Sequence, residues 1–541
     1  MNRLKLSPRL WVNEFINRVV TFVVRPVTVN PYFFILLFFL FVVPDIYSFL
    51  VYSDLIPFIV AATGFLFCYM LLLPVVMLPS SFRKIYKFIL LLLGLVIFAL
   101  QICSIVIYER SVNLLTPDML AAILATNQAE AQEFVMTYFN WNIALLVLAL
   151  IALLLIFFYK LNRITLNLNV IPRIILFLFI VLSISIVFLK YENVSKIVTV
   201  QMLIKGKVPD LKEYRQDPIL VKCGDTPENI VLIIGESFSK YHSSLYGYEK
   251  QTNPLLERMV ADSALYVYKN VESLALSTIP CIKSIMSSYR NEYADSIEWY
   301  KCLTIIDVMK ENGYEISWLS NQSKRGVHDN EVGRYAELCD KEYFIGDIYS
   351  GLERSNFDEE LLPYIDHCIT DNGMNFIVIQ LMGSHAAYNK RYPVEYERFT
   401  VGDYEDTYKE LSDDKKQLVA EYDNSVLYND SVVSEIMNSF AEKEAVVFYF
   451  SDHGEDVFMS SKNFIGHGNY GNAPSEEVIK QIPFMVYTTD KFRERFPQIE
   501  ERIKQAVDTP YRTDSVMYTI MDVAGIDSVN GVSYKHKSLF K

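Results

Sequence analysis

Two hydrophobic patterns divide the chain. The first 190 residues contain five long apolar stretches, each close to the roughly 20 residues that a helix needs to cross a bilayer. They run over residues 32–51, 56–78, 88–108, 143–159 and 171–189. After about residue 226 the apolar stretches are short, and longer helical patterns separate them. We therefore expect a transmembrane domain of five helices (1–190), a charged connector (191–225) and a second domain (226–541).

The second domain is predicted to be an α/β/α sandwich. Its short runs, rich in β-branched and aromatic residues, are typical of strands. They cover residues 229–234, 315–319, 375–381, 445–450 and 483–487. Strands that alternate with helices indicate a mostly parallel central sheet with helices on both faces.

Composition and charge support this division. Of the 541 residues, 52% are hydrophobic and only 21% are charged, which favours a membrane protein over an ordinary soluble one. Residues 1–190 hold 13 Lys and Arg against 7 Asp and Glu, whereas residues 191–541 have a net charge of −19 and all seven histidines. An acidic second half would repel phosphate backbones, so we expect no nucleic-acid partner.

The charges of the loops predict an orientation. Basic residues precede the first apolar stretch and lie between the second and third and around the fourth connection, whereas the alternate loops are acidic. The positive-inside rule places the N-terminus in the cytoplasm, so five crossings put everything after Lys190 in the periplasm or its equivalent. No cleavable signal peptide is evident, because residues 1–29 form a basic amphipathic lead.

Cysteine usage fits an exported second domain. Two cysteines, Cys68 and Cys103, lie in apolar stretches, where cysteine packs as a small apolar residue. Five more lie after residue 190, in a compartment where disulfides persist: Cys223, Cys281, Cys302, Cys339 and Cys368. Because five is odd, at least one should stay free, and the sequence leaves the pairing open.

Chemically active residues follow the predicted strands. The strands are followed by Gly235-Glu236-Ser237, by the polar stretch 320–325, by Gly383-Ser384-His385 and by Ser451-Asp452-His453. Open α/β sheets bind ligands at the carboxyl ends of their strands. Glutamate, aspartate and histidine form a ligand set that suits zinc with one position open.

The open position could hold a nucleophilic hydroxyl, whose pKa the metal would lower. A candidate lies in the loop 273–281, before a helix predicted over 281–289. A helix N-terminus also offers amides to a phosphoryl oxygen. Each piece has a simpler interpretation alone: a turn at Asp452-His453, a helix cap at Glu236-Ser237, a satisfied polar His385, or a helix start at Thr278. Four such pieces in this order favour a metal site.

Several segments resemble one family. These are VLIIGESFSKYHSSLYGYEKQTNPLLERM, LSTIPCIKSIMSSY, FIVIQLMGSHAAYNKRYP and the pair FYFSDHGEDV and NFIGHGNYG. Together with five apolar stretches they resemble the phosphoethanolamine transferases that modify lipid A and lipopolysaccharide core. This group includes the mobile colistin-resistance enzymes and belongs to the alkaline phosphatase/sulfatase superfamily. The resemblance covers nearly the whole chain and implies the sulfatase-like fold.

The resemblance implies a set of site residues. Zinc, one ion or two, would be held by Glu236, Asp452 and His453, with the nucleophile Thr278 as fourth ligand. The other implied residues are His385 and His467 near the phosphoryl group, Asn321 with Lys324 or Arg325 at the phosphate, and Thr126 and Glu130 in a lipid-facing segment.

Two positions depart from the family pattern. Ala275 stands where the colistin-resistance enzymes carry their threonine, and no cysteine precedes Cys281 in this loop. The superfamily spacing of nucleophile-x-Pro instead selects Thr278, with Ser277 as the alternative. Ala122 stands where the lipid-facing helix tends to carry asparagine.

The implied function is transfer of phosphoethanolamine from phosphatidylethanolamine to lipid A or lipopolysaccharide core, through a phosphothreonine, by a multi-pass protein of the bacterial inner membrane. Two alternatives remain: a glycerolphosphate transferase of the lipoteichoic-acid type, and a membrane-tethered scaffold without metal. A sulfatase is less favoured, because no Cys/Ser-x-Pro-Ser-Arg stands at the nucleophile. The acceptor, the number of zinc ions and the oligomeric state stay open.

Overall fold

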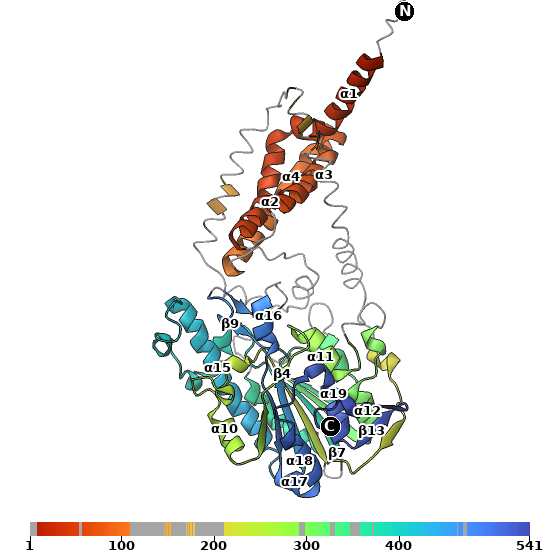
Figure 1. Ribbon diagram of the computed structural model, residues 1–541, viewed down its shortest axis with the longest axis vertical. Coiled ribbons are helices and arrows are strands. Elements are labelled where there is room, and N and C mark those ends of the chain that lie inside the picture. The colour runs from red at the N-terminus through yellow and green to blue at the C-terminus, as the bar shows by residue number, and fades with distance from the viewer. Residues whose placement is uncertain are drawn as a thin grey trace, which may run out of the picture. The chain divides into compact units, whose positions relative to one another are not determined.

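The computed structural model forms two compact units, one holding the N-terminal helices and one holding the residues from Asp210 onward (Figure 1). The described residues are 8–52, 57–108, single positions between 145 and 178, 210–290, 298–324, 331–346, 357–370, 373–462, 464–468 and 473–541. Most of the fourth and fifth predicted spans lie outside them. Three predicted site residues, Thr126, Glu130 and Arg325, also lie outside the described residues.

The first unit contains helices over the first three predicted spans. Its described helices are α1 (Pro8–Val29), α2 (Pro31–Tyr52), α3 (Pro57–Met77) and α4 (Ser80–Tyr108). The predicted amphipathic lead is thus mostly the helix α1. Helix α2 packs against α3 and α4, and buried side chains such as Leu37, Leu40 and Leu72 form the contact. Cys68 is fully buried there, as expected of a cysteine that packs as an apolar residue.

Within the described residues no individual helix is both long and apolar enough to cross a membrane. The bent pair Val12–Val29 and Pro31–Pro44, with 71° between its two parts, meets that criterion jointly.

The second unit is built on a seven-stranded sheet with the order β3-β11-β8-β2-β7-β5-β6. Strands β8, β2, β7, β5 and β6 run parallel to one another, whereas β11 is antiparallel to both β8 and β3. The predicted mostly parallel sheet is therefore confirmed. Its strands are β2 (Asn229–Gly235), β3 (Leu265–Tyr268), β5 (Tyr314–Ser320), β6 (Lys341–Phe344), β7 (Met374–Gln380), β8 (Ala445–Ser451) and β11 (Phe484–Thr488).

Small sheets lie outside this central one. Strand β1 (Leu220–Lys222), from the end of the predicted connector, pairs with β13 (Ile526–Val529), which also pairs with β14 (Val532–Ser533). Strand β4 (Val271–Glu272) pairs with β12 (Tyr511–Arg512), and β9 (Asp456–Val457) pairs with β10 (Ile465–Gly466).

Helices cover both faces of the central sheet, as Figure 1 shows. One face packs against α11 (Thr278–Met286), α12 (Ile305–Glu311), α19 (Val516–Val523) and α13 (Glu331–Ala336), with α17 (Asp490–Arg495) and α18 (Pro497–Gln505). The other packs against α10 (Pro254–Ala261), α14 (Leu362–Cys368) and the long α15 (Asp413–Asn438). Helix α16 (Ala473–Lys480) contacts β9.

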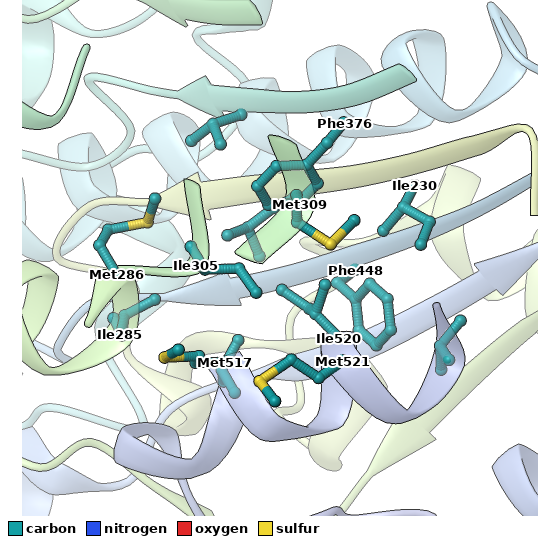
Figure 2. Close-up of a cluster of buried hydrophobic side chains, with 14 of the residues drawn as sticks. Ile230, Ile285, Met286, Ile305, Met309, Phe376, Phe448, Met517, Ile520 and Met521 are labelled. Carbon is teal, nitrogen blue, oxygen red and sulfur yellow. The ribbon is translucent and has the colours of Figure 1, made fainter. Parts of the chain in front are cut away.

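The two hydrophobic cores follow from the alternation of side chains along each strand. In β2, Ile230, Leu232 and Ile234 belong to one core, whereas Val231 and Ile233 belong to the other. Figure 2 shows the first core, where strand side chains such as Phe376 and Phe448 face methionines and isoleucines of α11, α12 and α19. Because both faces are buried, these strands are continuously apolar rather than alternating.

The five predicted strands coincide with β2, β5, β7, β8 and β11 to within one residue at either end. The short strands β3 and β6 were not predicted. The helix predicted over 281–289 was placed too late, since α11 begins at Thr278 and Ser277 is its N-cap. All five cysteines after residue 190 are free thiols.

Candidate active site

Glu236 and Asp452 lie side by side because β2 and β8 are adjacent parallel strands. Gly235 pairs with Ser451 in their register, so the next residue of each chain leaves the sheet at the same point. The amide of Asp452 donates to the carbonyl of Gly235 at 3.0 Å, which extends the ladder by one bond. Both carboxylates are almost fully buried, at 2% and 0% exposure.

The turn after Glu236 is held in an unusual backbone conformation. Ser237 has a φ of 55°, in the left-handed region that costs a non-glycine residue free energy. The buried Tyr422 hydroxyl fixes this turn by donating to the Ser237 carbonyl and accepting from the Ser239 amide, each at 2.7 Å. Gly383 closes over it, since a Cβ there would lie 2.6 Å from the Glu236 carbonyl oxygen.

Thr278 brings a hydroxyl to this site from the start of α11. It is the first residue of α11, and Pro280 fits the first turn because the amides there have no partner within the helix. Its Oγ1 donates to Glu236 Oε2 at 3.0 Å and lies 3.3 Å from His453 Nε2. Ser277, the alternative nucleophile, is the N-cap, and its side chain makes no cap hydrogen bond.

The contacts of His453 define which of its two ring nitrogens faces the site. Its Nδ1 lies 3.0 Å from the Gly454 carbonyl, which can only accept, so Nδ1 carries a proton. Its Nε2 faces three oxygen-bearing groups, at 3.2 Å from Glu236 Oε1, 3.5 Å from Asp452 Oδ2 and 3.3 Å from Thr278 Oγ1. This is the tautomer in which Nε2 can bind a metal.

The charges of these groups perturb one another strongly. Burial and the charge of Glu236 raise the pKa of Asp452 to about 8. Burial disfavours a charged imidazole, but Asp452 and Glu236 outweigh it and raise the pKa of His453 to about 10. Burial also acts to raise the pKa of Glu236, yet the nearby imidazoles, His453 first, hold it well below its usual range. The site therefore favours one cation between two buried carboxylates.

The residues present fit a zinc ion. Asp452 Oδ2 is buried and has no hydrogen-bond partner among the described residues, which is costly unless a cation is bound. Ligand atoms of Glu236, His453 and His467 all lie within 4.8 Å of one another. Carboxylate oxygen and imidazole nitrogen are ordinary zinc ligands.

His467 reaches the site from the two-stranded β9–β10 hairpin, directly after Gly466. Its ring centroid lies 4.1 Å from that of His453, and its Nδ1 lies 2.7 Å from Glu455 Oε2. The buried Glu455 also accepts a hydrogen bond from the Tyr388 hydroxyl. This chain of contacts fixes the imidazole and leaves Nε2 for a metal or phosphate.

His385 lies at the edge of the same group. Its ring centroid is 6.3 Å from that of His467, and its carbonyl accepts from Arg391 Nε at 3.2 Å. The structure thus brings six of the predicted residues together at the carboxyl edge of the sheet. They are Glu236, Thr278, His385, Asp452, His453 and His467.

The polar stretch after β5 enters the site through a residue that was not predicted. Asn321 is buried, and its Nδ2 donates to Asp358 at 2.8 Å rather than to Glu236. The next residue, Gln322, donates to Glu236 Oε2 and to the Leu381 carbonyl, each at 3.1 Å. Asn321 therefore supports the loop, because Asp358 also accepts from two backbone amides of the 382–383 turn.

Lys324 is occupied by acidic neighbours. Its Nζ lies 2.5 Å from Glu342 Oε1 and 3.9 Å from Glu337 Oε1. A lysine so engaged is a poor phosphate ligand unless these ion pairs break. Gln322 could have been found in the sequence, since it lies one residue after Asn321 at a strand end, but a glutamine carries no catalytic signal by itself.

The fold and this site define a class of protein. The chain belongs to the sulfatase family, whose sequence pattern matches residues 228–526. The predicted resemblance to phosphoethanolamine transferases, enzymes of the alkaline phosphatase/sulfatase superfamily, is confirmed by comparison with characterised proteins.

The chain is 26% identical to phosphoethanolamine transferase EptC of Escherichia coli K12 over 495 residues, 85% of this chain and 83% of that protein. It is 28% identical to EptA of Helicobacter pylori over 302 residues, 54% of this chain and 53% of that one. The zinc complex of the periplasmic domain of E. coli EptC superposes with a TM-score of 0.53 at 25% identity, over 60% of this chain and 90% of that domain. The integral membrane protein EptA of Neisseria meningitidis shares the fold, with a TM-score of 0.67 at 20% identity over 94% and 98% of the two chains.

Proposed function

We propose that this protein transfers phosphoethanolamine from phosphatidylethanolamine to lipid A or lipopolysaccharide core, with Thr278 as the nucleophile. The observation that carries the proposal is the position of the Thr278 hydroxyl, at a helix start and in contact with both Glu236 and His453. The names of the similar EptC and EptA proteins support the transferred group.

Zinc would be held by Glu236, Asp452 and His453 together with Thr278, and His467 is close enough to join them or to hold a second ion. The metal supplies Lewis-acid chemistry, which lowers the pKa of a bound hydroxyl and offsets negative charge on phosphate. The buried Asp452 Oδ2, which accepts no hydrogen bond from any described residue, supports this assignment.

The chain's own residues account for the handling of the nucleophile. Glu236 Oε2 accepts the hydroxyl hydrogen bond of Thr278 and so directs a lone pair of Oγ1 away from the sheet. Gln322 donates to the same carboxylate oxygen and limits its rotation. Attack of Thr278 Oγ1 on the donor phosphorus would break the bond from phosphorus to the diacylglycerol oxygen, and the hydroxyl proton would end on that oxygen as diacylglycerol leaves. A hydroxyl or phosphate oxygen of the acceptor would then attack the phosphothreonine, take the phosphoethanolamine group and return the proton to Thr278.

The imidazoles beyond the carboxylates are assigned to the phosphoryl group. His467 is held by Glu455, which Tyr388 holds in turn, and His385 lies beside it. The His467 ring also lies against that of His453, whose Nε2 is 3.3 Å from the Thr278 hydroxyl. Such groups can donate to phosphate oxygens as negative charge develops in the transition state.

The lipid substrates explain the N-terminal helices. Donor and acceptor both reside in membranes, so an enzyme that joins them gains from an anchor beside the bilayer. We propose five spans, a cytoplasmic N-terminus and a periplasmic catalytic domain in the inner membrane. Phosphatase fusions at Lys84 and Tyr191 test this orientation. Activity from the first, or none from the second, would contradict it.

The phosphothreonine is tested by mass spectrometry of the purified protein after brief exposure to phosphatidylethanolamine. We expect a covalent phosphoethanolamine adduct of about 123 Da on Thr278, as the proposed nucleophilic mechanism requires. The Thr278→Ala variant should bind zinc but stay unlabelled, and Ser277→Ala is the matched control that should still be labelled. An adduct on Ser277 would refute the assignment of the nucleophile.

The acceptor is tested by mass spectrometry of lipid A and core from cells with and without the gene. The gain of one phosphoethanolamine on either fraction supports the proposal and identifies the acceptor. If both fractions are unchanged while an adduct forms on Thr278, the acceptor is neither of these molecules.

A further inference from the structure

A tyrosine of the long helix α15 supports the turn that carries Glu236, and no step of the proposed reaction uses it. Tyr422 is fully buried, and α15 covers one face of the central sheet (Figure 1). Its hydroxyl donates to the Ser237 carbonyl and accepts from the Ser239 amide, each at 2.7 Å. One hydroxyl thus spends its donor and an acceptor on the same short turn.

Ser237 connects this turn to the carboxylate of Glu236. Its Oγ donates to Glu236 Oε1 at 2.8 Å, and the same oxygen lies 3.2 Å from His453 Nε2. The position of this Oγ depends on the backbone of Ser237, whose φ of 55° lies in the left-handed region. A residue other than glycine stays in that region only where its surroundings hold it there.

The peptide group between Ser237 and Phe238 is held at both ends. Its carbonyl accepts from Tyr422, and its amide donates to Ser451 Oγ at 2.9 Å. Removing the tyrosine hydroxyl therefore leaves the turn attached to β8 but releases its carbonyl. We expect the fold to survive this change while the Ser237 backbone turns and its Oγ loses its direction.

The ring of Tyr422 makes separate contacts that do not involve the hydroxyl. Its centroid lies 5.0 Å from that of Tyr388, which donates to Glu455, and 5.0 Å from that of His242. Both contacts are edge-to-face ring contacts, which phenylalanine would keep. The action of the hydroxyl on the Glu236 turn can therefore be removed by itself.

We propose that Tyr422 is a positioning residue for Glu236 and that it acts through Ser237. The Tyr422 hydroxyl holds the Ser237 backbone, Ser237 Oγ holds Glu236 Oε1, and the carboxylate keeps one direction towards the metal. This inference rests on the proposed function, in which Glu236 binds zinc. Partners that orient a metal ligand from outside contribute about 10- to 100-fold to metal affinity or activity.

The test combines competition of the full-length protein with a chelator for zinc and steady-state kinetics at saturating zinc. We expect Tyr422→Phe to lower zinc affinity by about tenfold. At saturating zinc kcat should fall while KM stays, because Glu236 accepts the hydrogen bond of the Thr278 nucleophile. A tyrosine that only stabilises the fold would change neither zinc affinity nor kcat.

Tyr314→Phe is the matched control, because it acts at the other end of the same strand. Tyr314 is 4% exposed, and its hydroxyl donates to the Pro227 carbonyl, just before β2, at 2.8 Å. The control also loses a buried tyrosine hydrogen bond to backbone, so thermal unfolding should show a loss of stability in both variants. Zinc affinity should fall in Tyr422→Phe alone, and an equal fall in the control would overturn the proposal.

The route through Ser237 is tested by a double-mutant cycle. Ser237→Ala removes the Oγ donor and should weaken zinc binding by about tenfold. If Tyr422 acts through that donor, the double variant should lose about tenfold in total rather than about 100-fold, because both changes break one chain of contacts. Losses that multiply would overturn this route.

Glu236→Gln separates failure of this proposal from failure of the proposed function. If Glu236→Gln binds zinc poorly while Tyr422→Phe binds it like the wild type, Tyr422 does not position the ligand and the present proposal alone is overturned. If Glu236→Gln keeps full zinc affinity, Glu236 is not a ligand and both proposals fail. If the wild type binds zinc but transfers no phosphoethanolamine, the proposed function fails while the zinc affinities still decide the role of Tyr422.

Discussion

Two buried histidine–carboxylate clusters in the catalytic unit have opposite balances of hydrogen-bond donors and acceptors. At the strand ends, His453 Nε2 faces the carboxylates of Glu236 and Asp452, and Asp452 Oδ2 has no hydrogen-bond partner among the described residues. In the other cluster, His242 and Asp423 are fully buried and 2.6 Å apart between Nδ1 and Oδ1. Both pairs look alike as residue types, yet only the strand-end pair has a carboxylate oxygen without a hydrogen-bond donor among the described residues.

The difference lies in what else surrounds each carboxylate. Asp423 is satisfied by three donors, since the hydroxyls of Tyr248 and Tyr404 both donate to its Oδ2 while His242 occupies Oδ1. Such a cluster fixes the loop after β2 against α15, and both oxygens of its carboxylate already have donors, although His242 Nε2 has no hydrogen-bond partner among the described residues. In the strand-end cluster acceptors exceed donors, and an added cation would remove that deficit. Residue type therefore identifies a candidate site. The balance of hydrogen-bond donors and acceptors around the carboxylate then indicates whether the cluster has a structural role or can bind a metal.

The largest expected effect comes from Asp452→Asn. The amide loses the charge and one acceptor at the metal, so we expect zinc affinity to fall by more than about 100-fold, beyond what loss of an outer partner costs. Transfer activity should be lost with it. Elemental analysis of the purified variant measures the zinc. Full zinc occupancy would remove Asp452 from the ligand set and erase the distinction between the clusters.

The matching change in the other cluster, Asp423→Asn, should act on stability instead. It leaves the buried His242 and two tyrosine hydroxyls without an anionic acceptor, which costs about 3 kcal/mol in the free energy of unfolding. Zinc content at low temperature should equal that of the wild type. Thermal unfolding of the zinc-loaded protein measures the stability. A variant that unfolds like the wild type would show that this cluster does not hold the loop.

More of the fold than of the candidate site could be predicted from the sequence. Strands β2, β5, β7, β8 and β11 were found because a strand buried on both faces is a continuous apolar run. Strands β3 and β6 were missed because they are four residues long and only partly buried at the edges of the sheet. The start of α11 was placed too late, although Pro280 is compatible with its first turn.

The strand ends were also predictable, since parallel strands bring their carboxyl ends to one edge. The contacts that orient the side chains at these strand ends were not predictable from the sequence. Gln322 reaches Glu236 across 86 positions of sequence, and Tyr388 reaches Glu455 across 67. His242 and Asp423 are separated by 181 positions, so no local pattern distinguishes a saturated carboxylate from a deficient one. Donor balance is a property of the folded chain.

A smaller effect is expected where a donor supports the strand-end cluster from outside. Tyr388→Phe removes the hydroxyl that fixes Glu455, which in turn holds His467 Nδ1. We expect zinc affinity or turnover to fall by about tenfold, as for other outer partners of metal ligands. Competition with a chelator and steady-state kinetics measure the two quantities. If neither zinc affinity nor turnover changes, His467 does not belong to the residues that bind the metal or the phosphoryl group.

The smallest effect is expected for Tyr404→Phe, the counterpart of that change in the saturated cluster. Tyr404 donates to Asp423 Oδ2, but Tyr248 donates to the same oxygen at 2.7 Å and remains after the substitution. Because the carboxylate keeps donors on both oxygens, the loss should be about 1 kcal/mol of unfolding free energy, the usual net value of one hydrogen bond. Zinc affinity should not change, since Asp423 makes no contact with the metal-binding group. Thermal unfolding measures the stability of the variant, and competition with a chelator measures its zinc affinity. A fall in zinc affinity as large as that of Tyr388→Phe would mean that both clusters act as one network, and the contrast between them would fail.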